Sequence, residues 1–247
     1  MTEYLVFRLY APLASWGEPA VGETRPSATH PGRGAILGLL GAALGIRRDD
    51  DEGQSELRDS VRVAVKQRSP GILLRDYHTA QVPGERKGVV YRTRRDELSA
   101  PRKVINTILS SRDYRCDGLW TVAVWLSPEA TLTLGALEQA LKTPHFPLYL
   151  GRKACPPAAP LDPRRVTVER LKEALDTEFP KLVRDEQQAL RLASESLYCW
   201  EGEAAMLDGK KEGVESNAIW DSPLNRRRWQ FGPRTEYRRF VRHEEGN

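Results

Sequence analysis

The stretch that decides the fold is GAILGLLGAALGI, which runs from Gly34 to Ile46. Its apolar residues recur at the spacing of one helix face: Ile36, Leu37, Leu40 and Leu44. Three glycines, Gly38, Gly41 and Gly45, follow at steps of three and four residues. Each costs roughly 1 kcal/mol relative to alanine in a helix interior, so their repetition indicates that another backbone approaches closely. We predict a helix packed tightly on a sheet.

The segments around this helix predict that sheet. Tyr4–Tyr10 is rich in aromatic and branched residues, Val61–Val65 alternates apolar and other residues, and Leu119–Leu126 is apolar, so all three are expected strands. Leucines at helical spacing predict a helix over Thr133–Leu141, and Pro147–Leu150 is expected to be a short strand. The order strand, helix, strand, strand, helix, strand predicts an α+β, ferredoxin-like βαββαβ core, as in RNA-recognition domains.

The rest of the chain is expected to decorate this core. The acidic run Asp49–Glu52 should end the first helix in a solvated loop. We expect a core over residues 1–155 and a C-terminal extension over residues 156–247. The extension should hold a proline-rich opening, a mixed helical stretch at Val166–Ser194, and strands at Leu197–Glu201 and Arg228–Val241.

Composition limits the class of protein. The 247 residues are 40% hydrophobic and 29% charged, and no apolar run approaches the ~18 residues that a membrane span needs. The amino terminus lacks the basic region and long apolar block of a secretory signal, so we expect a cytoplasmic protein without membrane contact. Three widely spaced cysteines, Cys116, Cys155 and Cys199, indicate reduced packing residues rather than disulfides or zinc ligands, and neither metal nor cofactor is expected.

Positive charge is concentrated in two segments. Arg75–Arg115 holds ten Arg or Lys against five Asp or Glu, and Arg226–Arg242 holds seven Arg against one Glu. Such clusters are candidate surfaces for a polyanion, and the alternative is an ordinary solvated face.

Two glycine turns carry basic residues. In GRGAILG (Gly32–Gly38), neither GxxxxGK[ST] nor GxGxxG is matched, which argues against a nucleoside triphosphate site. The turn can still bind an RNA phosphate at the helix amino terminus. Its expected RNA-binding residues, and those of the second turn in YLGRKACP, are Arg25, His30, Arg33, Gly34, Gly151, Arg152 and Lys153. We expect both turns to line one groove. The alternative is that the glycines serve only close packing and that the arginines simply face solvent.

The segment Tyr77–Asp117 mixes basic and aromatic residues, which suits single-stranded RNA better than a duplex. Its expected RNA-binding residues are His78, Arg86, Lys87, Arg92, Arg94, Arg95, Arg102, Lys103 and Arg112, with Tyr91 among them.

A catalytic reading is the alternative. HExxH and GxSxG are absent, and the chain has four histidines. A metal-independent ribonuclease would need a base for a 2′-hydroxyl and a cation for the phosphate, and Tyr77, His78 and Lys87 are the best such trio. We expect no catalytic residues.

Several strings, taken in order, resemble the CasD family of type I-E CRISPR Cascade subunits, a branch of the repeat-associated mysterious proteins. They are SWGEP (Ser15–Pro19), TRPSATHPGRGAILGLLGAALGIRRDD (Thr24–Asp50), RDYHT (Arg75–Thr79), DYRCDG (Asp113–Gly118) and PLYLGRKACPPAAPL (Pro147–Leu161). The resemblance fades after Leu161.

The resemblance implies a non-catalytic subunit that caps the 5′ handle of the guide RNA (crRNA) in antiviral defence. It implies a thumb at about Thr79–Arg115 and a handle groove at the turns Gly32–Gly34 and Gly151–Lys153. The implied partners are a CasC-type backbone subunit, a CasA-type large subunit and target DNA, which pairs with the guide in the assembled complex. Related proteins of another CRISPR subtype cut precursor RNA, so a metal-independent endoribonuclease that processes precursor crRNA stays the alternative.

Overall fold

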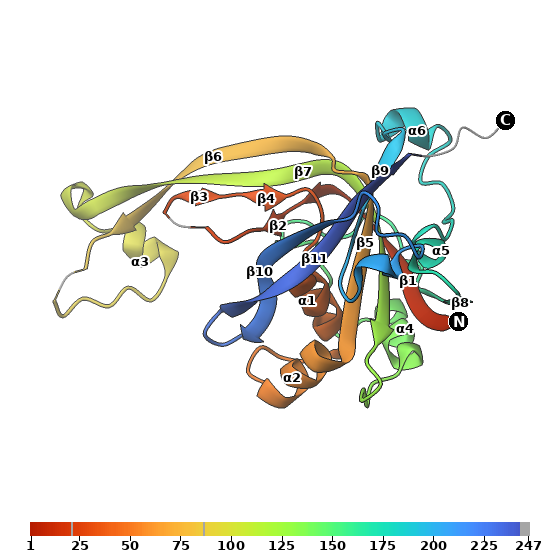
Figure 1. Cartoon of the computed structure of the whole chain (residues 1–247). Coiled ribbons are helices and arrows are strands. Elements are labelled where there is room, and N and C mark those ends of the chain that lie inside the picture. The colour runs from red at the N-terminus through yellow and green to blue at the C-terminus, as the bar shows by residue number, and fades with distance from the viewer. Residues whose placement is uncertain (21, 86, 243–247) are drawn as a thin grey trace.

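The computed structural model describes residues 1–20, 22–85 and 87–242. These residues form an α+β fold on one nine-stranded, mostly antiparallel sheet, with a separate two-stranded ribbon of β2 (Trp16–Gly17) and β4 (Ser27–Ala28). Figure 1 shows a rounded body from which one long hairpin projects.

Four strands form one side of the sheet. They are β1 (Thr2–Ala14), β5 (Val61–Ser69), β7 (Ile105–Leu126) and the edge strand β8 (Arg164–Val168), in the spatial order β5-β7-β1-β8 with antiparallel neighbours. β1 is buried over most of its length, because helices cover both of its faces. The predicted strands at Tyr4–Tyr10, Val61–Val65 and Leu119–Leu126 are confirmed, and each extends further.

One face of the sheet is covered by α1 (Arg33–Leu44), α2 (Asp51–Ser60) and α4 (Leu134–Lys142), which lie in the lower half of the body in Figure 1. The predicted glycine helix and the predicted leucine helix are therefore confirmed. α1 ends at Gly45, whose positive φ of 81° allows the left-handed cap that terminates the helix.

The opposite face is covered by the short helix α5 (Leu171–Leu175). Its leucines pack with Tyr4 and Val6 of β1 and with Trp200 in a second buried cluster. A further one-turn helix, α6 (Glu186–Ala189), lies nearby in sequence. Most of the expected helical stretch Val166–Ser194 is instead strand β8 and loop.

The C-terminal third extends the sheet beyond β5. β9 (Glu195–Trp200) pairs with β5, and the hairpin of β10 (Glu215–Asn225) and β11 (Gln230–Arg242) continues the order as β10-β11-β9. The two strands predicted here correspond to β9 and β11 and are confirmed. β10 was not predicted, and the short 3-10 helix η2 (Ala204–Met206) precedes it.

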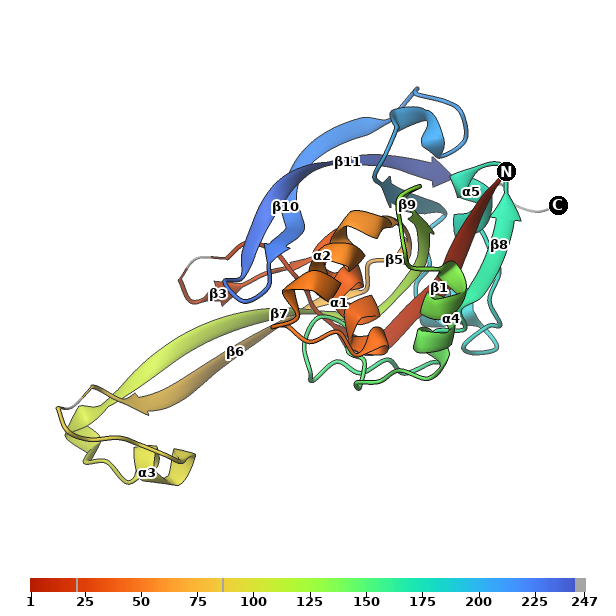
Figure 2. The same cartoon turned by 90° about the horizontal axis from the view of Figure 1, so that it is seen from below.

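The segment predicted as an insertion is an ordered hairpin, here called the long hairpin. β6 (Ile72–Pro83) pairs antiparallel with the first half of β7, from Ile72 opposite Cys116 to Pro83 opposite Ile105. Its far end carries α3 (Arg94–Leu98) and the 3-10 helix η1 (Arg102–Val104). Figures 1 and 2 both show it reaching away from the body.

Two further sequence predictions of local structure are wrong. Pro147–Leu150 is not a strand; Leu150 is fully buried in a turn that hydrogen-bonds to Ser15, and β8 pairs with β1 instead. The acidic run Asp49–Glu52 does not close α1 in a loop but starts α2, because the Asp50 carboxylate accepts the Gly53 N–H as an N-cap. Across the described ranges, no helix combines the length and apolarity that crossing a bilayer requires.

Candidate nucleic-acid interface

The glycine turn at Gly151 is built against the first strand. Gly151 has a positive φ of 86°, and a Cβ there would lie 1.7 Å from the Ser15 carbonyl oxygen. The Ser15 N–H donates to the Leu150 carbonyl oxygen at 3.0 Å, which fixes the turn to the end of β1. Only glycine fits this close approach. The turn places half-buried Arg152 and exposed Lys153 beside the base of the long hairpin.

Arg152 meets two other predicted site residues there. Its guanidinium carbon lies 4.6 Å from the ring centroid of Tyr114 on β7, and its Nη2 donates to the Arg25 carbonyl oxygen at 3.3 Å. Arg25 lies in β3 (Thr24–Arg25), which pairs with β7 opposite Arg112. Arg25 and Arg112 are both exposed, and with Arg152 they form what we call the basic cluster. The structure thus brings three predicted residues from three segments together.

The base of the long hairpin is fixed by contacts that the sequence did not reveal. Arg75 on β6 makes a two-pronged ion pair with Asp113 on β7, at 2.8 and 3.0 Å. Arg115 donates to the carbonyl oxygens of Ser27 and Ala28 at 3.0 and 3.1 Å. Hydrogen bonding to Arg75 holds the pKa of the Asp113 carboxyl below its usual value. The hairpin therefore leaves the body in a defined direction.

The far end of the long hairpin is strongly cationic. α3 begins with a capping box in which the Thr93 and Asp96 side chains each accept a backbone N–H of the other residue. Arg94 is paired with Glu97 at 2.5 Å. The exposed predicted residues on this end are Lys87, Arg92, Arg94, Arg95, Arg102 and Lys103; Arg86 lies outside the described residues.

Large apolar side chains lie exposed along the long hairpin. Tyr77 on β6 is 65% exposed and Val90 is 81% exposed, and Ile108 on β7 is 48% exposed. Exposed aromatic and apolar side chains can contact the bases of a single-stranded nucleic acid, while neighbouring arginines bind its phosphates.

The first glycine turn is occupied by the protein itself. A Cβ on Gly32 would lie 2.6 Å from Asp221 Oδ2, and one on Gly34 would lie 2.8 Å from the Asp221 carbonyl oxygen. Asp221 on β10 also accepts the Arg33 N–H at 2.6 Å, so its carboxylate sits where a phosphate was expected. The groove expected between the two turns is therefore not lined by Gly32–Gly34 in this structure.

Two further predicted residues, His30 and Arg33, point into the protein. Arg33 is 5% exposed. Its guanidinium donates to the Val61 carbonyl oxygen at 2.9 Å and to the Glu201 carboxylate at 3.2 Å. His30 Nε2 lies 3.3 Å from Glu236 Oε1. Their assignment to RNA stays a prediction, and their contacts give them a structural role that joins the loop before α1 to β9 and β11.

The pKa shifts in this network follow from burial and pairing. Burial alone would lower the pKa of His30, but the facing Cys199 and Glu236 outweigh it and raise that pKa well above 6.5. Burial would likewise raise the pKa of Glu236, and His30 and Arg234 outweigh it and hold that pKa below 4.5. An ion pair of imidazolium and carboxylate is the resulting state at neutral pH.

The catalytic trio of the alternative reading is not assembled. Tyr77 and His78 are consecutive on β6, so their side chains point to opposite faces of the hairpin. His78 Nδ1 lies 3.4 Å from Asp76. Lys87 follows the end of β6 by four residues. The three side chains therefore do not share one face of the hairpin in this structure.

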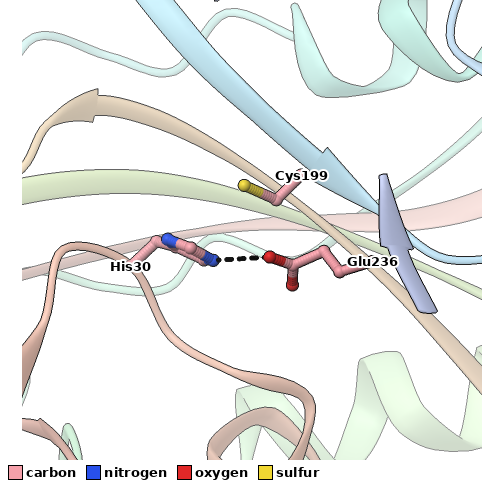
Figure 3. Close-up of side chains that lie close together, drawn as sticks. All are labelled: His30, Cys199 and Glu236. Carbon is pink, nitrogen blue, oxygen red and sulfur yellow. Dashed lines mark ion pairs between the residues drawn. The ribbon is translucent and has the colours of Figure 1, made fainter. Parts of the chain in front are cut away.

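The ligand atoms of His30, Cys199 and Glu236 all lie within 4.8 Å of one another, and among the residues with described positions no other group of this kind forms. Figure 3 shows the three side chains converging from the loop before α1, from β9 and from β11. All three cysteines are free thiols, and Cys155 and Cys199 are buried.

Comparison with known proteins identifies the class. The family model described as "CRISPR-associated protein (Cas_Cas5)" matches residues 4–237. This chain therefore belongs to that family of CRISPR-associated proteins.

Within this class, the chain is 41% identical over 169 residues to the protein named CRISPR system Cascade subunit CasD of Escherichia coli (strain K12), covering 65% of this chain and 70% of that one. The resemblance to CasD read from the sequence is confirmed.

Two solved structures have a fold similar to that of this chain. A chain from a structure titled "CRISPR RNA-guided surveillance complex" is 26% identical, with a TM-score of 0.64 over 98% of this chain and 90% of its own length. A second, titled "Crystal structure of Cas protein", is 25% identical, with a TM-score of 0.53 over 97% and 93%. The fold is thus shared along nearly the whole chain, including the third in which the sequence resemblance fades.

Proposed function

We propose that this protein is a non-catalytic guide-RNA-binding subunit of a type I-E Cascade complex, and that it caps the 5′ handle of the crRNA. The observation that carries the proposal is the basic cluster, where Arg25, Arg112 and Arg152 meet beside Tyr114 at the base of a cationic hairpin. The family supplies the context, since a similar protein is named as a Cascade subunit and another belongs to an RNA-guided complex.

The proposed RNA path starts at the basic cluster and follows the long hairpin, which serves as the thumb. Arginine binds phosphate through two parallel donors, and its flat guanidinium stacks on a base or an aromatic ring. Arg152 already lies over Tyr114, so this pair forms a platform at which a base of the handle can stack. The exposed cations of the hairpin then neutralise the phosphates that follow.

We further propose that the body is a ferredoxin-like core. β1, α1, β5, β7, α4 and β8 follow in the βαββαβ order, the strands are arranged β5-β7-β1-β8, and α1 and α4 cover one face. In this proposal the core reaches β8, beyond residue 155, and β9–β11 form the extension.

The proposed protein partners are a CasC-type backbone subunit and a CasA-type large subunit, with target DNA paired to the guide in the assembled complex. The complex would work in the cytoplasm, where guide and target meet. Exposed Trp220, Trp229 and Phe240 on the C-terminal hairpin, each 59% exposed, offer apolar surface for such a subunit contact.

The test is binding of the full chain to a fluorescent RNA that carries the 5′ handle. The double variant Arg112→Ala, Arg152→Ala removes two cations of the basic cluster. At about 1–2 kcal/mol for each contact, we expect the Kd to rise by roughly 30-fold or more.

The matched control is Arg47→Ala, which removes a cation, 77% exposed, from the loop between α1 and α2. That loop lies at the lower end of the body in Figure 1, away from the long hairpin. We expect the control to bind within about twofold of the wild type. Equal losses in the double variant and the control would contradict a defined RNA path.

A further inference from the structure

The buried surface between the C-terminal hairpin and the loop before α1 holds an unusual set of side chains. Cys199 lies on β9 and pairs in register with Arg238 on β11, so Glu236, two residues earlier on β11, lies diagonal to it on the same face of the sheet. His30 approaches that face from the loop before α1, as Figure 3 shows. A thiol, an imidazole and a carboxylate therefore share one small space.

The spacing of these groups matches the coordination shell of zinc. Zn–N and Zn–O bonds of about 2.0–2.2 Å place two neighbouring ligand atoms roughly 3.3 Å apart in a tetrahedron. The observed distance between His30 Nε2 and Glu236 Oε1 is 3.3 Å. All three ligand atoms lie within 4.8 Å, so closing on an ion asks the cysteine to move by about 1 Å.

The surroundings orient two of the three ligands. Arg234 donates to Glu236 Oε2 at 2.8 Å, which leaves Oε1 directed at His30. On the far side of the imidazole, His30 Nδ1 lies 3.5 Å from the Thr29 hydroxyl, which can accept its proton. Such outer contacts fix the tautomer that presents Nε2 to a metal.

We propose that His30, Cys199 and Glu236 form a zinc site, with a water molecule as the fourth ligand. A thiolate, an imidazole nitrogen and a carboxylate oxygen are the donor types that zinc takes in proteins. The site joins the loop before α1 to two strands of the C-terminal third, so its role is to hold that loop in place.

The experiment uses the untagged full chain, freed of metal by a chelator, with Co²⁺ as a spectroscopic probe and Zn²⁺ as competitor. We expect one Co²⁺ per chain, with a thiolate-to-cobalt charge-transfer band and the visible bands of four-coordinate cobalt, all removed by one equivalent of Zn²⁺. Cys199→Ser should abolish the charge-transfer band, whereas Cys155→Ser, which changes another buried cysteine, should keep it.

A reading on the wild-type chain guards against a variant that fails to fold. Zinc at a hundredfold excess over its Kd should raise the Tm by about 5–10 °C. Absence of the charge-transfer band in the wild type, or its persistence in Cys199→Ser, would overturn the zinc site. Neither result bears on RNA binding, which Arg112 and Arg152 test separately.

Discussion

At the scale of single residues, the interface depends on backbone that only particular side chains permit. Gly151 holds the turn against Ser15, and this contact places Arg152 over Tyr114. The sequence pointed to this turn, because a glycine next to Arg and Lys is a local signal. Tyr114 could not be found in this way, since its contact with Arg152 exists only after β7 has paired and the turn has folded.

Replacing Gly151 by Ala should therefore disturb both stability and RNA binding. The Cβ would overlap the Ser15 carbonyl oxygen and the positive φ is strained for alanine, so we expect a loss of roughly 1–3 kcal/mol in the free energy of unfolding. Chemical denaturation measures it. The control is Gly17→Ala, where a Cβ meets nothing within 4 Å and no change beyond about 0.5 kcal/mol is expected. An unchanged stability in Gly151→Ala would refute the close approach.

At the scale of secondary-structure elements, the sequence predicted those that are rich in buried apolar residues. β1 and α1 are apolar over most of their length, and α4 buries three leucines at helical spacing. The long hairpin was missed as strand because β6 is exposed on both faces, so apolar and polar residues do not alternate along it. The ion pair of Arg33 could not be predicted from the sequence either, because its partner Glu201 lies 168 residues later in the chain.

A polar network ties α5 to the sheet. Asp176, next to the end of α5, accepts hydrogen bonds from Lys66 on β5 at 2.7 Å and from Lys172 at 2.6 Å, and Tyr198 on β9 donates to it as well. Burial alone would raise the pKa of Asp176, but these donors outweigh it and hold the pKa below the usual 3.8.

This shift predicts a pH dependence. A carboxyl whose pKa is lower in the folded state stabilises the protein above the unfolded value of 3.8, and that stabilisation is lost as the pH falls through the folded pKa. Asp176→Asn should thus be about 1–3 kcal/mol less stable at pH 7, with the difference shrinking in acid below pH 3.8. Urea denaturation across pH 2–7 measures both.

The control for this prediction is Asp49→Asn, which changes a carboxylate that is 63% exposed on the loop between α1 and α2. Its stability curve should follow that of the wild type. A difference between Asp176→Asn and wild type that stays constant down to the lowest pH would contradict the assigned cause.

At the scale of the whole molecule, charge is distributed so that one projecting element carries a cationic surface away from a neutral core. The sequence located this surface by counting charges, but it could not separate the arginines that face solvent from those that are internal. Arg33 is buried and Arg234 is half-buried, and both lie in ion pairs, whereas Arg112 and the cations at the far end of the hairpin are exposed. That difference decides which arginines are available to a polyanion.

The exposed cations predict a steep salt dependence of RNA binding. Each phosphate contact on single-stranded RNA contributes about 0.7 to the slope of log K against log salt concentration. Arg112→Ala should lower that slope by about 0.7, and Arg47→Ala should leave it unchanged. Titrations of handle RNA at four or more salt concentrations give the slopes. An identical slope in wild type and Arg112→Ala would exclude Arg112 from the RNA path.

The central claim, handle binding without cleavage, is tested most directly by one gel. End-labelled precursor repeat RNA is incubated with the full chain in EDTA, beside a repeat whose handle sequence is scrambled. We predict a shifted, uncut RNA and weaker binding of the scrambled repeat. A discrete cleavage product that disappears in His78→Ala would instead establish the metal-independent endoribonuclease, and equal binding of both repeats would contradict recognition of the handle.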